Sequence, residues 1–333
     1  MRHQIKDDYL IKKVIPFDVY KIRSIEDLLE NLKYCGFQGR NLGHALDILE
    51  KMVSDNECLK VLALSGAMVP AGMGGLICSL IEHNIIDVLI TTGAIITHDL
   101  VDAIVNIGHY IGSSNVDDNE LYNLKINRIY DILLPEDNYI TTENKLLEII
   151  NEVFKDKKIE ISPSEFLKQI GNKIDKRCIL SLAAKHNLPI FIPAFSDSEL
   201  SLDLIKFTVK EGYEFNFNIF EDVKKFAKII KTYKKAGLFL VGGGVPRNWA
   251  QQIFPYLDNL EGLREHGIEC GYKYSVRIHT ATEYDGGLSG CTISESKSWG
   301  KYALDSQYVS VWCDATIALP ILVTGLFQRL KII

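Results

Sequence analysis

The chain has 333 residues, of which 47% are hydrophobic and 24% charged, and it carries a formal net charge of −6. This length and apolar content can bury a substantial core in one large domain or two smaller ones. The negative charge and the lack of a concentrated lysine and arginine block argue against nucleic acid as the main partner. A small cationic substrate suits the chain better.

The start of the chain and its cysteines bear on the compartment. Residues 1–13 contain no apolar core and no small-residue cleavage site, so we expect no secretory signal. Apolar runs are interrupted before they reach membrane-spanning length. The seven cysteines are scattered without a C-x-x-C pair, which argues against a disulfide framework and against a zinc site. We therefore expect a reduced, cytoplasmic protein with no membrane contact and no metal.

Two helices are predicted at the start of the chain. Ser24 begins a sequence that resembles a capping box, and apolar residues at helical spacing follow it as far as Leu32. A second helical pattern runs from Leu42 to Met52. We assign residues 1–57 to an N-terminal helical extension.

From residue 58 onward, short apolar runs alternate with amphipathic ones, a pattern typical of buried parallel strands joined by helices. The polar region 113–160 is expected to be an insertion or an excursion of loop and helix over the surface. The pattern predicts a single α/β domain in which residues 58–333 form a doubly wound, mostly parallel sheet with helices on both faces. The predicted strands are 59–65, 86–91, 189–193, 237–241, 274–279 and 308–313.

In such a sheet ligands bind beyond the carboxyl ends of the strands, so the residues that follow each strand are candidates. Residues 65–75 are small and lead into a helix that could receive a phosphate on its free N–H groups, although a tightly packed turn explains them equally simply. Thr92, Gly93 and Ala94 follow the second strand. His98 comes shortly after them, and an isolated histidine there fits a cap or a surface residue better than a catalyst.

The next two strand ends carry an acid and a glycine run. Asp197 follows the third strand, where a helix cap is the simplest role for an isolated aspartate. Gly242, Gly243 and Gly244 follow the fourth strand, and three successive glycines predict either a positive φ or a close approach of the backbone. The run is not G-x-G-x-x-G, so it is only a moderately specific sign of a dinucleotide site.

A polar loop after the fifth strand leads to Lys301. Burial of a lysine against an apolar wall disfavours the ammonium and can lower its pKa by several units. The free amine can then form a Schiff base. From spacing alone, a surface Lys301 beside a core Trp299 is the more common arrangement. The polar candidates of this region are Thr280, Asp285, Ser289 and Glu295.

Seven segments, in order along residues 59–330, resemble the deoxyhypusine synthase family, especially its archaeal and bacterial deoxyhypusine-synthase-like branch. They are SGAMVPAGM (65–73), VLITTGAIITHDL (88–100), PAFSD (193–197), VGGGVPRNW (241–249), EYDGGLSG (283–290), SWGK (298–301) and DAT (314–316). The resemblance implies a Rossmann-like fold and NAD as cofactor. It also implies transfer of a 4-aminobutyl group from spermidine, through an imine on a lysine, to a lysine of a hypusine-type translation factor.

The resemblance further implies a homotetramer with active sites between paired subunits. It gives Lys301 the place of the covalent lysine, Trp299 that of an indole along the amine channel, and Glu295 that of a carboxylate that binds a substrate ammonium. Contacts with NAD are implied for Thr92, Gly93, Ala94, Asp197, Gly242, Gly243, Thr280, Asp285, Ser289, Asp314 and Ala315.

The chain departs from the eukaryotic pattern at four substrate positions. Asn248 stands in place of a histidine, Leu288 of an aspartate, His98 of a glutamate and Leu202 of an aspartate, with Asp203 one position away. We retain Asn248, His98 and Asp203 as candidate substrate contacts. The changes leave the covalent chemistry better supported than the identity of the amine or of the acceptor.

Two alternatives to a protein acceptor stay open. One is transfer to a free diamine such as putrescine, as in a homospermidine synthase. The other is a non-catalytic protein that binds NAD or a polyamine. Retention of Lys301, Glu295 and Trp299 argues against this last alternative, because binding alone does not require a nucleophile.

Overall fold

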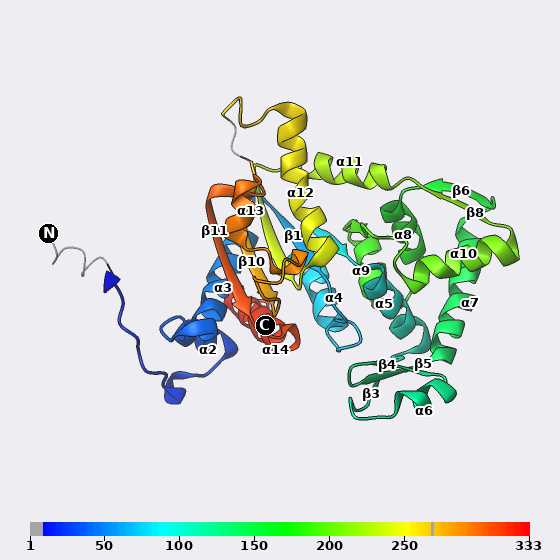
Figure 1. The fold of residues 1–333 in the computed structure, drawn as a ribbon, viewed down its shortest axis with the longest axis horizontal. Coiled ribbons are helices and arrows are strands. Elements are labelled where there is room, and N and C mark those ends of the chain that lie inside the picture. Colours follow the sequence, from blue (N-terminus) through cyan, green and yellow to red (C-terminus); the bar gives the residue numbers. More distant parts are fainter. Residues whose placement is uncertain (1–8, 268–269) are drawn as a thin grey trace.

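A computed structural model describes residues 9–267 and 270–333, so the first eight residues of the predicted 1–57 extension lie outside the described part. At its centre is a six-stranded parallel sheet in the order β11-β10-β9-β1-β2-β7 (Figure 1). The strands are β1 (Cys58–Leu64), β2 (Val88–Thr91), β7 (Ile190–Phe191), β9 (Lys235–Val241), β10 (Tyr272–His279) and β11 (Tyr302–Trp312).

The strand order is that of a Rossmann fold. From β1 the chain moves outward through β2 to β7, and it then returns to the other side of β1 and moves outward through β9 and β10 to β11. The direction of winding therefore reverses between β1 and β9, which is where doubly wound sheets bind their ligands. The predicted doubly wound, parallel α/β architecture is confirmed.

Helices cover both faces of the sheet. Alternate side chains of each strand point to opposite faces, and because the side chains on both faces are apolar, each face needs a covering layer. On β1, Leu62 and Leu64 pack into one apolar cluster with helices α3 (Phe37–Ser54), α4 (Gly74–Glu82), α5 (Gly93–Val105) and α14 (Ala315–Arg329). Val61 and Ala63 pack into a second cluster with α11 (Ile219–Ile230) and α12 (Gly244–Glu261). The site described below lies on the α12 face.

The predicted N-terminal helices are both present, after a short 3-10 turn, η1 (Val19–Lys21). The Ser24 hydroxyl accepts a hydrogen bond of 3.0 Å from the backbone N–H of Asp27 and so caps α2 (Ile25–Leu32). Helix α3 packs directly against β10 and β11, and Leu46, Leu49 and Met52 of α3 are buried in the core. The extension is therefore an integral layer of the sheet domain.

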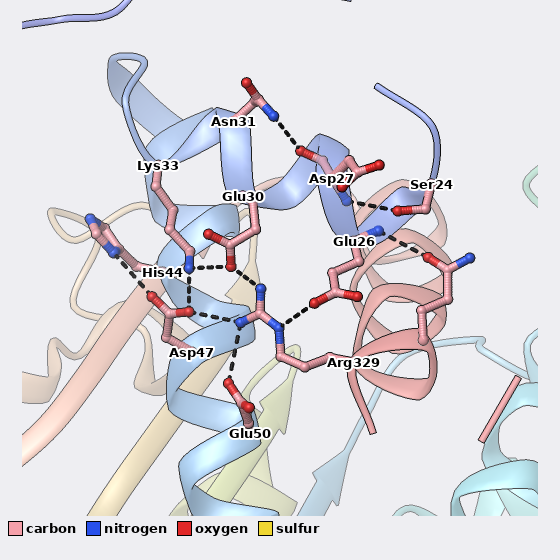
Figure 2. A network of polar contacts seen from close by, with 11 residues as sticks. Ser24, Glu26, Asp27, Glu30, Asn31, Lys33, His44, Asp47, Glu50 and Arg329 are labelled. Carbon is pink, nitrogen blue, oxygen red and sulfur yellow. Dashed lines mark hydrogen bonds and ion pairs between the residues drawn. The ribbon is translucent and has the colours of Figure 1, made fainter. Parts of the chain in front are cut away.

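A charged cluster joins α2 and α3 to the C-terminal helix α14 (Figure 2). The Arg329 side chain is only 10% exposed and contacts four carboxylates, those of Glu26, Glu30, Asp47 and Glu50. Lys33 contacts two of the same acids, Glu30 and Asp47. We call this set of side chains the Arg329 cluster.

The region 113–160 is more ordered than an excursion of loop and helix. It contributes α6 (Asp118–Asn123), β4 (Ile126–Ile129), β5 (Ile132–Pro135), α7 (Glu136–Val153) and β6 (Lys158–Ile161). Strands β4 and β5 pair with β3 (Tyr110–Ile111) in a small antiparallel sheet, and β6 pairs with β8 (Glu214–Phe217). The small sheet and α7 lie to one side of the main sheet, as Figure 1 shows.

Helices α8 (Pro163–Gly171), α9 (Ile179–Lys185) and α10 (Glu199–Glu211) follow the region 113–160 in the chain. The short elements η2 (Leu288–Gly290) and α13 (Ile293–Ser298) lie between β10 and β11. The last strand, β11, begins at Tyr302, six residues before the predicted start and directly after Lys301. Among the described residues, no helix combines the length and the apolar character needed to cross a membrane.

Candidate active site

The glycine run forms a tight turn at the point where the winding of the sheet reverses. Gly242 and Gly244 have φ values of +79° and +62°, the left-handed region that favours glycine. The N–H of Gly243 donates to the hydroxyl of Ser65, at the end of β1, over 2.9 Å. A Cβ on Gly243 would lie 2.7 Å from the hydroxyl of Ser289. The sequence predicted either a positive φ or a close approach of the backbone at this turn, and the structure shows positive φ at Gly242 and Gly244 and close approach at Gly243.

The other residues predicted to contact a nucleotide lie along the same edge, because they follow neighbouring parallel strands. Gly93 begins α5 and packs so closely on Ser198 that an added Cβ would lie 2.3 Å from the Cβ of Ser198. Ser198, and not Asp197, caps α10, so the capping role suggested for Asp197 is wrong. Asp197 is exposed and stands one residue before this cap.

At the β10 and β11 side of this edge, the predicted nucleotide residues shape a loop and cap a helix. Thr280 follows β10 directly, and Asp314 caps α14 by accepting a hydrogen bond of 2.8 Å from the N–H of Thr316. Asp285 accepts a hydrogen bond of 2.8 Å from the N–H of Gly287 and so shapes the loop. The predicted nucleotide positions Thr92, Ala94, Thr280, Asp285 and Ala315 are at least partly accessible to solvent.

One buried side chain at this edge lacks a partner. His279, the last residue of β10, is 4% exposed, and neither of its ring nitrogens has a hydrogen-bond partner among the described residues. Burial, then the charges of Arg277 and Arg247, lower the pKa of His279 to about 4, while a backbone contact with Ala281 that falls short of hydrogen-bond geometry opposes the shift. A buried imidazole with two unsatisfied nitrogens next to Thr280 fits a site that receives polar groups of a ligand.

Beside the glycine turn lies a cavity of about 730 Å³ between α12 and the segment 283–301. It contains four residues that the sequence associated with substrate, namely Asn248, Glu295, Trp299 and Lys301. Leu288 also lines this cavity, and the next residue, Ser289, accepts a hydrogen bond of 3.0 Å from the N–H of Gly244. The cavity and the glycine turn therefore share one wall.

Lys301 is buried in this cavity, with 9% of its surface exposed. Its amine donates to the side-chain oxygen of Asn248 over 3.1 Å and lies 5.8 Å from the ring centre of Trp299. Burial is the main cause of a lowered pKa of Lys301, and Arg247 lowers it further, while Cys291 and Glu295 oppose the shift. Trp299 is 63% exposed. The alternative of a surface lysine beside a core tryptophan is therefore wrong, since the burial is the reverse.

Comparison with known proteins identifies the family. The deoxyhypusine synthase family model matches residues 27–326. The chain belongs to the deoxyhypusine synthase family. The match confirms the resemblance seen in the sequence and extends it into α2 and α3.

Curated members of this family are similar over nearly the whole chain. "Probable deoxyhypusine synthase 2" of Methanosarcina acetivorans is 35% identical over 95% of this chain and 90% of its own length. The protein of the same name from Archaeoglobus fulgidus is 38% identical over 87% of this chain and 94% of its own. The "Deoxyhypusine synthase-like protein" of Chlorobaculum tepidum is 33% identical over 90% and 85%.

A solved structure supports the fold. The crystal structure of an Entamoeba histolytica protein assigned to the deoxyhypusine synthases aligns with a TM-score of 0.64 over 95% of this chain and 97% of the other. Its sequence identity is 19%, so this likeness concerns the architecture.

Two residues predicted to contact substrate lie outside the Lys301 cavity of the same chain. His98, within α5, is hydrogen-bonded to His109 over 2.9 Å, and His109 is bonded to Asp102 over 2.7 Å. Burial, then His109, lower the pKa of His98 to about 4. Asp203, within α10, pairs with Lys206 over 3.0 Å, and burial raises the pKa of Asp203 to about 6. His98 and Asp203 thus lie on α5 and α10, which do not line the Lys301 cavity.

Several residues of the site were missed from the sequence. Glu283 is a second carboxylate of the cavity, and Gln252, Tyr256 and Asn259 face it from α12. Their spacing along 252–259 is helical, but no motif distinguished that face from an ordinary surface. Arg277 was also missed, although an arginine within the apolar run 274–279 is itself an unusual signal.

Proposed function

We propose that this member of the deoxyhypusine synthase family is an NAD-dependent transferase. It moves a 4-aminobutyl group from spermidine, through an imine on Lys301, to an acceptor amine. The observation that carries the proposal is the buried amine of Lys301, whose pKa is lowered in a cavity that shares a wall with the glycine turn. A neutral amine is the form of lysine that attacks carbon.

The residues at the carboxyl edge of the sheet fit a dinucleotide. The glycine turn allows close approach of a ligand to the backbone, and the unsatisfied ring of His279 lies beside it. We infer that NAD would be held by the glycine turn together with the predicted positions on the neighbouring strand ends, from Thr92 to Ala315. When bound, NAD supplies a hydride acceptor for the carbon next to the secondary amine of spermidine and later returns that hydride.

Lys301 acts on the oxidised carbon. Its amine forms a new C–N bond, the C–N bond to the propylamine half of spermidine breaks, and the departing 1,3-diaminopropane takes up the proton that the lysine nitrogen loses. Asn248 has no titratable group, so it cannot carry that proton. Its side-chain oxygen, which accepts from the amine of Lys301, instead orients the nitrogen toward the cavity.

The cavity suits a cationic substrate. Glu283 and Glu295 line it, and a carboxylate partner is needed because an unpaired ammonium out of water costs several kcal/mol. The ring of Trp299 adds a face on which an ammonium can rest. The neutral residues Asn248 and Leu288 leave these two acids as the carboxylates of the cavity wall.

The same two acids favour a second acceptor besides a protein lysine. A free diamine such as putrescine carries two ammonium groups, one for each of Glu283 and Glu295. Competition between putrescine and a hypusine-type acceptor protein in one reaction, with the products separated by mass, distinguishes the two acceptors. Exclusive labelling of either one identifies it as the substrate.

We also propose the homotetramer that the family resemblance implies, with active sites between paired subunits. The position of His98 and Asp203 away from the Lys301 cavity of their own chain supports it, since a neighbouring subunit can bring such helices to the site. Analytical ultracentrifugation tests the assembly, and a monomer with full activity would contradict it.

Trapping with borohydride tests the reaction itself. After incubation with spermidine and NAD, reduction should leave a 4-aminobutyl adduct on the peptide that contains Lys301 and none on Lys301→Arg, because the guanidinium stays charged. Lys297, four residues away and on the same peptide stretch, is the internal control and should stay unlabelled. A preparation that binds NAD but gains no mass would instead favour a non-catalytic binding protein.

A further inference from the structure

Two arginines are buried behind the glycine turn without a carboxylate. Arg247, in the first turns of α12, is 2% exposed, and Arg277, in the middle of β10, is 1% exposed. Neither forms an ion pair with an acid among residues 9–267 and 270–333. Burial, followed by the charge of Arg247, lowers the pKa of Arg277 to about 10, so Arg277 stays charged at neutral pH.

The two guanidinium groups bind backbone carbonyls of one short segment. Arg247 donates to the carbonyl of Leu288 over 2.8 Å and to that of Cys291 over 2.7 Å. Arg277 donates to the carbonyl of Cys291 over 3.0 Å and also to that of Ser289. The segment 288–291 is therefore held from two sides by charged donors.

The two guanidinium groups also contact the glycine turn on one side and α13, beside the Lys301 cavity, on the other. Arg277 lies 3.4 Å from the carbonyl of Gly242 in the glycine turn, while Arg247 lies 3.4 Å from the hydroxyl of Ser296 in α13, the helix that precedes Lys301. Within the segment, Ser289 accepts from the N–H of Gly244, and Leu288 and Cys291 face the cavity.

Burial of two arginines in this way costs more free energy than holding a loop in place requires. Two like charges out of water, with carbonyl partners in place of carboxylates, are unfavourable, and neutral donors such as side-chain amides could satisfy the same carbonyls without that cost. Their retention at the junction of turn and cavity points to a role in the site.

We propose that Arg247 and Arg277 are positioning residues that fix the segment 288–291 as the common wall of the glycine turn and the Lys301 cavity. The proposal deepens the proposed function and rests on it where it treats turn and cavity as one active site. Loss of either guanidinium group allows the segment 288–291 to move, so nucleotide binding and the environment of Lys301 change together. The positive charge of Arg247 in addition disfavours the ammonium of Lys301.

The first test measures the wall in the protein without nucleotide. Hydrogen exchange of the amides 287–292 is compared in wild type, Arg277→Lys and Arg277→Met. Both variants lose the planar fork, so exchange should rise by about tenfold or more, the equivalent of one or two lost charged hydrogen bonds. Arg329→Lys is the control, because it perturbs a buried arginine far from the site and should leave these amides unchanged.

The second test measures the lysine, again without nucleotide. Reductive methylation with formaldehyde and cyanoborohydride, followed on the Lys301 peptide as a function of pH, reports the neutral amine. Removal of the charge in Arg247→Met should move half-modification to higher pH, while Arg247→Lys should keep it near wild type. Arg329→Lys should not move it.

A third measurement tests whether the segment 288–291 also affects nucleotide binding. The Kd of NAD, from calorimetry, should rise about tenfold in both Arg277→Met and Arg277→Lys, because both lose the planar guanidinium that holds the segment 288–291. Where Arg277→Met does not fold, Arg277→Lys decides the exchange test. Unchanged exchange at 287–292 in a folded Arg277 variant, or an equal change in Arg329→Lys, overturns the proposal. If no NAD binds and no adduct forms, the proposed function fails, yet the first two measurements still decide the role of the arginines.

Discussion

Arginine is buried in two regions of this molecule, and its partners differ completely. In the Arg329 cluster, one guanidinium meets four carboxylates, two of which Lys33 also contacts. Behind the glycine turn, Arg247 and Arg277 find backbone carbonyls and the hydroxyl of Ser296 among the described residues, and no carboxylate. The first arrangement gives each cation carboxylate partners, with the excess negative charge on partly exposed acids. The second leaves two guanidinium groups without a directly paired acid near a lysine that has to lose its proton, and such an arrangement of charge is typical of functional sites.

The largest expected effect comes from removing the nucleophile, which should affect catalysis without affecting stability. Lys301→Arg should abolish the borohydride-trapped adduct and turnover, because a guanidinium cannot form the imine, while the melting temperature stays close to wild type. Arg329→Lys should show the opposite pattern, with a lower melting temperature and normal turnover per folded molecule. Mass spectrometry and thermal unfolding of the two variants check this, and normal turnover in Lys301→Arg would refute the covalent role.

A second prediction concerns the Arg329 cluster itself. Arg329→Met leaves four acids without their shared partner and should lower the free energy of unfolding by about 2–3 kcal/mol, a value reduced by the partial exposure of the acids. Urea unfolding measures it. Arg128→Met, which breaks an exposed pair with Asp118, is the matched control and should cost less than about 1 kcal/mol. Equal losses would mean that the cluster is no more than a surface network.

The third prediction uses the unpartnered His279. Its pKa is about 4 in the folded protein against an ordinary 6.5, so between these values the unfolded chain binds a proton that the folded protein does not. This group therefore removes stability as the pH falls from 6.5 to 4, by up to about 1.4 kcal/mol per pH unit. In His279→Phe that contribution disappears, so the free energy of unfolding of the variant should rise relative to that of wild type as the pH falls.

Urea unfolding between pH 7 and 4 checks the third prediction, with the exposed His266→Phe as control. A constant difference across this range would mean that His279 finds a partner in solution. If the ring of His279 contacts the nucleotide, addition of NAD should reduce the pH dependence of the stability difference between His279→Phe and wild type. A ligand bound at the Arg329 cluster would not have this effect.

The smallest expected effect is that of the orienting amide. Asn248→Ala removes the acceptor of the Lys301 hydrogen bond and should slow adduct formation about tenfold with little change in stability. Asn259→Ala changes an amide of the same cavity that has no bond to the lysine, and it should stay within about twofold of wild type. Single-turnover trapping rates measure both, and equal rates would remove Asn248 from the mechanism.

The main sheet could be predicted because each of its strands is an apolar run, as in 59–65 and 237–241. Strand β11 was predicted too short, because Asp305, Ser306 and Gln307 are polar residues on the outermost strand of the sheet, where burial does not select apolar side chains. The small sheet of β3, β4 and β5 was missed because its strands have only two to four residues.

The candidate site divides in the same way. Lys301, Trp299 and the glycine turn were found through motifs in contiguous sequence. Arg277, Gln252 and Tyr256 were not, because their role depends on which strand or helix face meets which, and spacing along the chain does not encode that. The burial of Lys301 and the exposure of Trp299 also required the fold, since a motif does not say which of two neighbours points inward.

The pairing of β10 with β11 has a consequence for how the nucleophile is anchored. Tyr272 pairs with Tyr302 and Tyr274 with Gln307, so two steps on β10 correspond to five on β11. The extra residues form a bulge just after Lys301, whose carbonyl is fixed by the N–H of Tyr272 over 3.1 Å. The register of β11 beyond the bulge is therefore set separately from the position of Lys301, and we expect a residue inserted at 304–306 to shift the bulge and leave the amine in place.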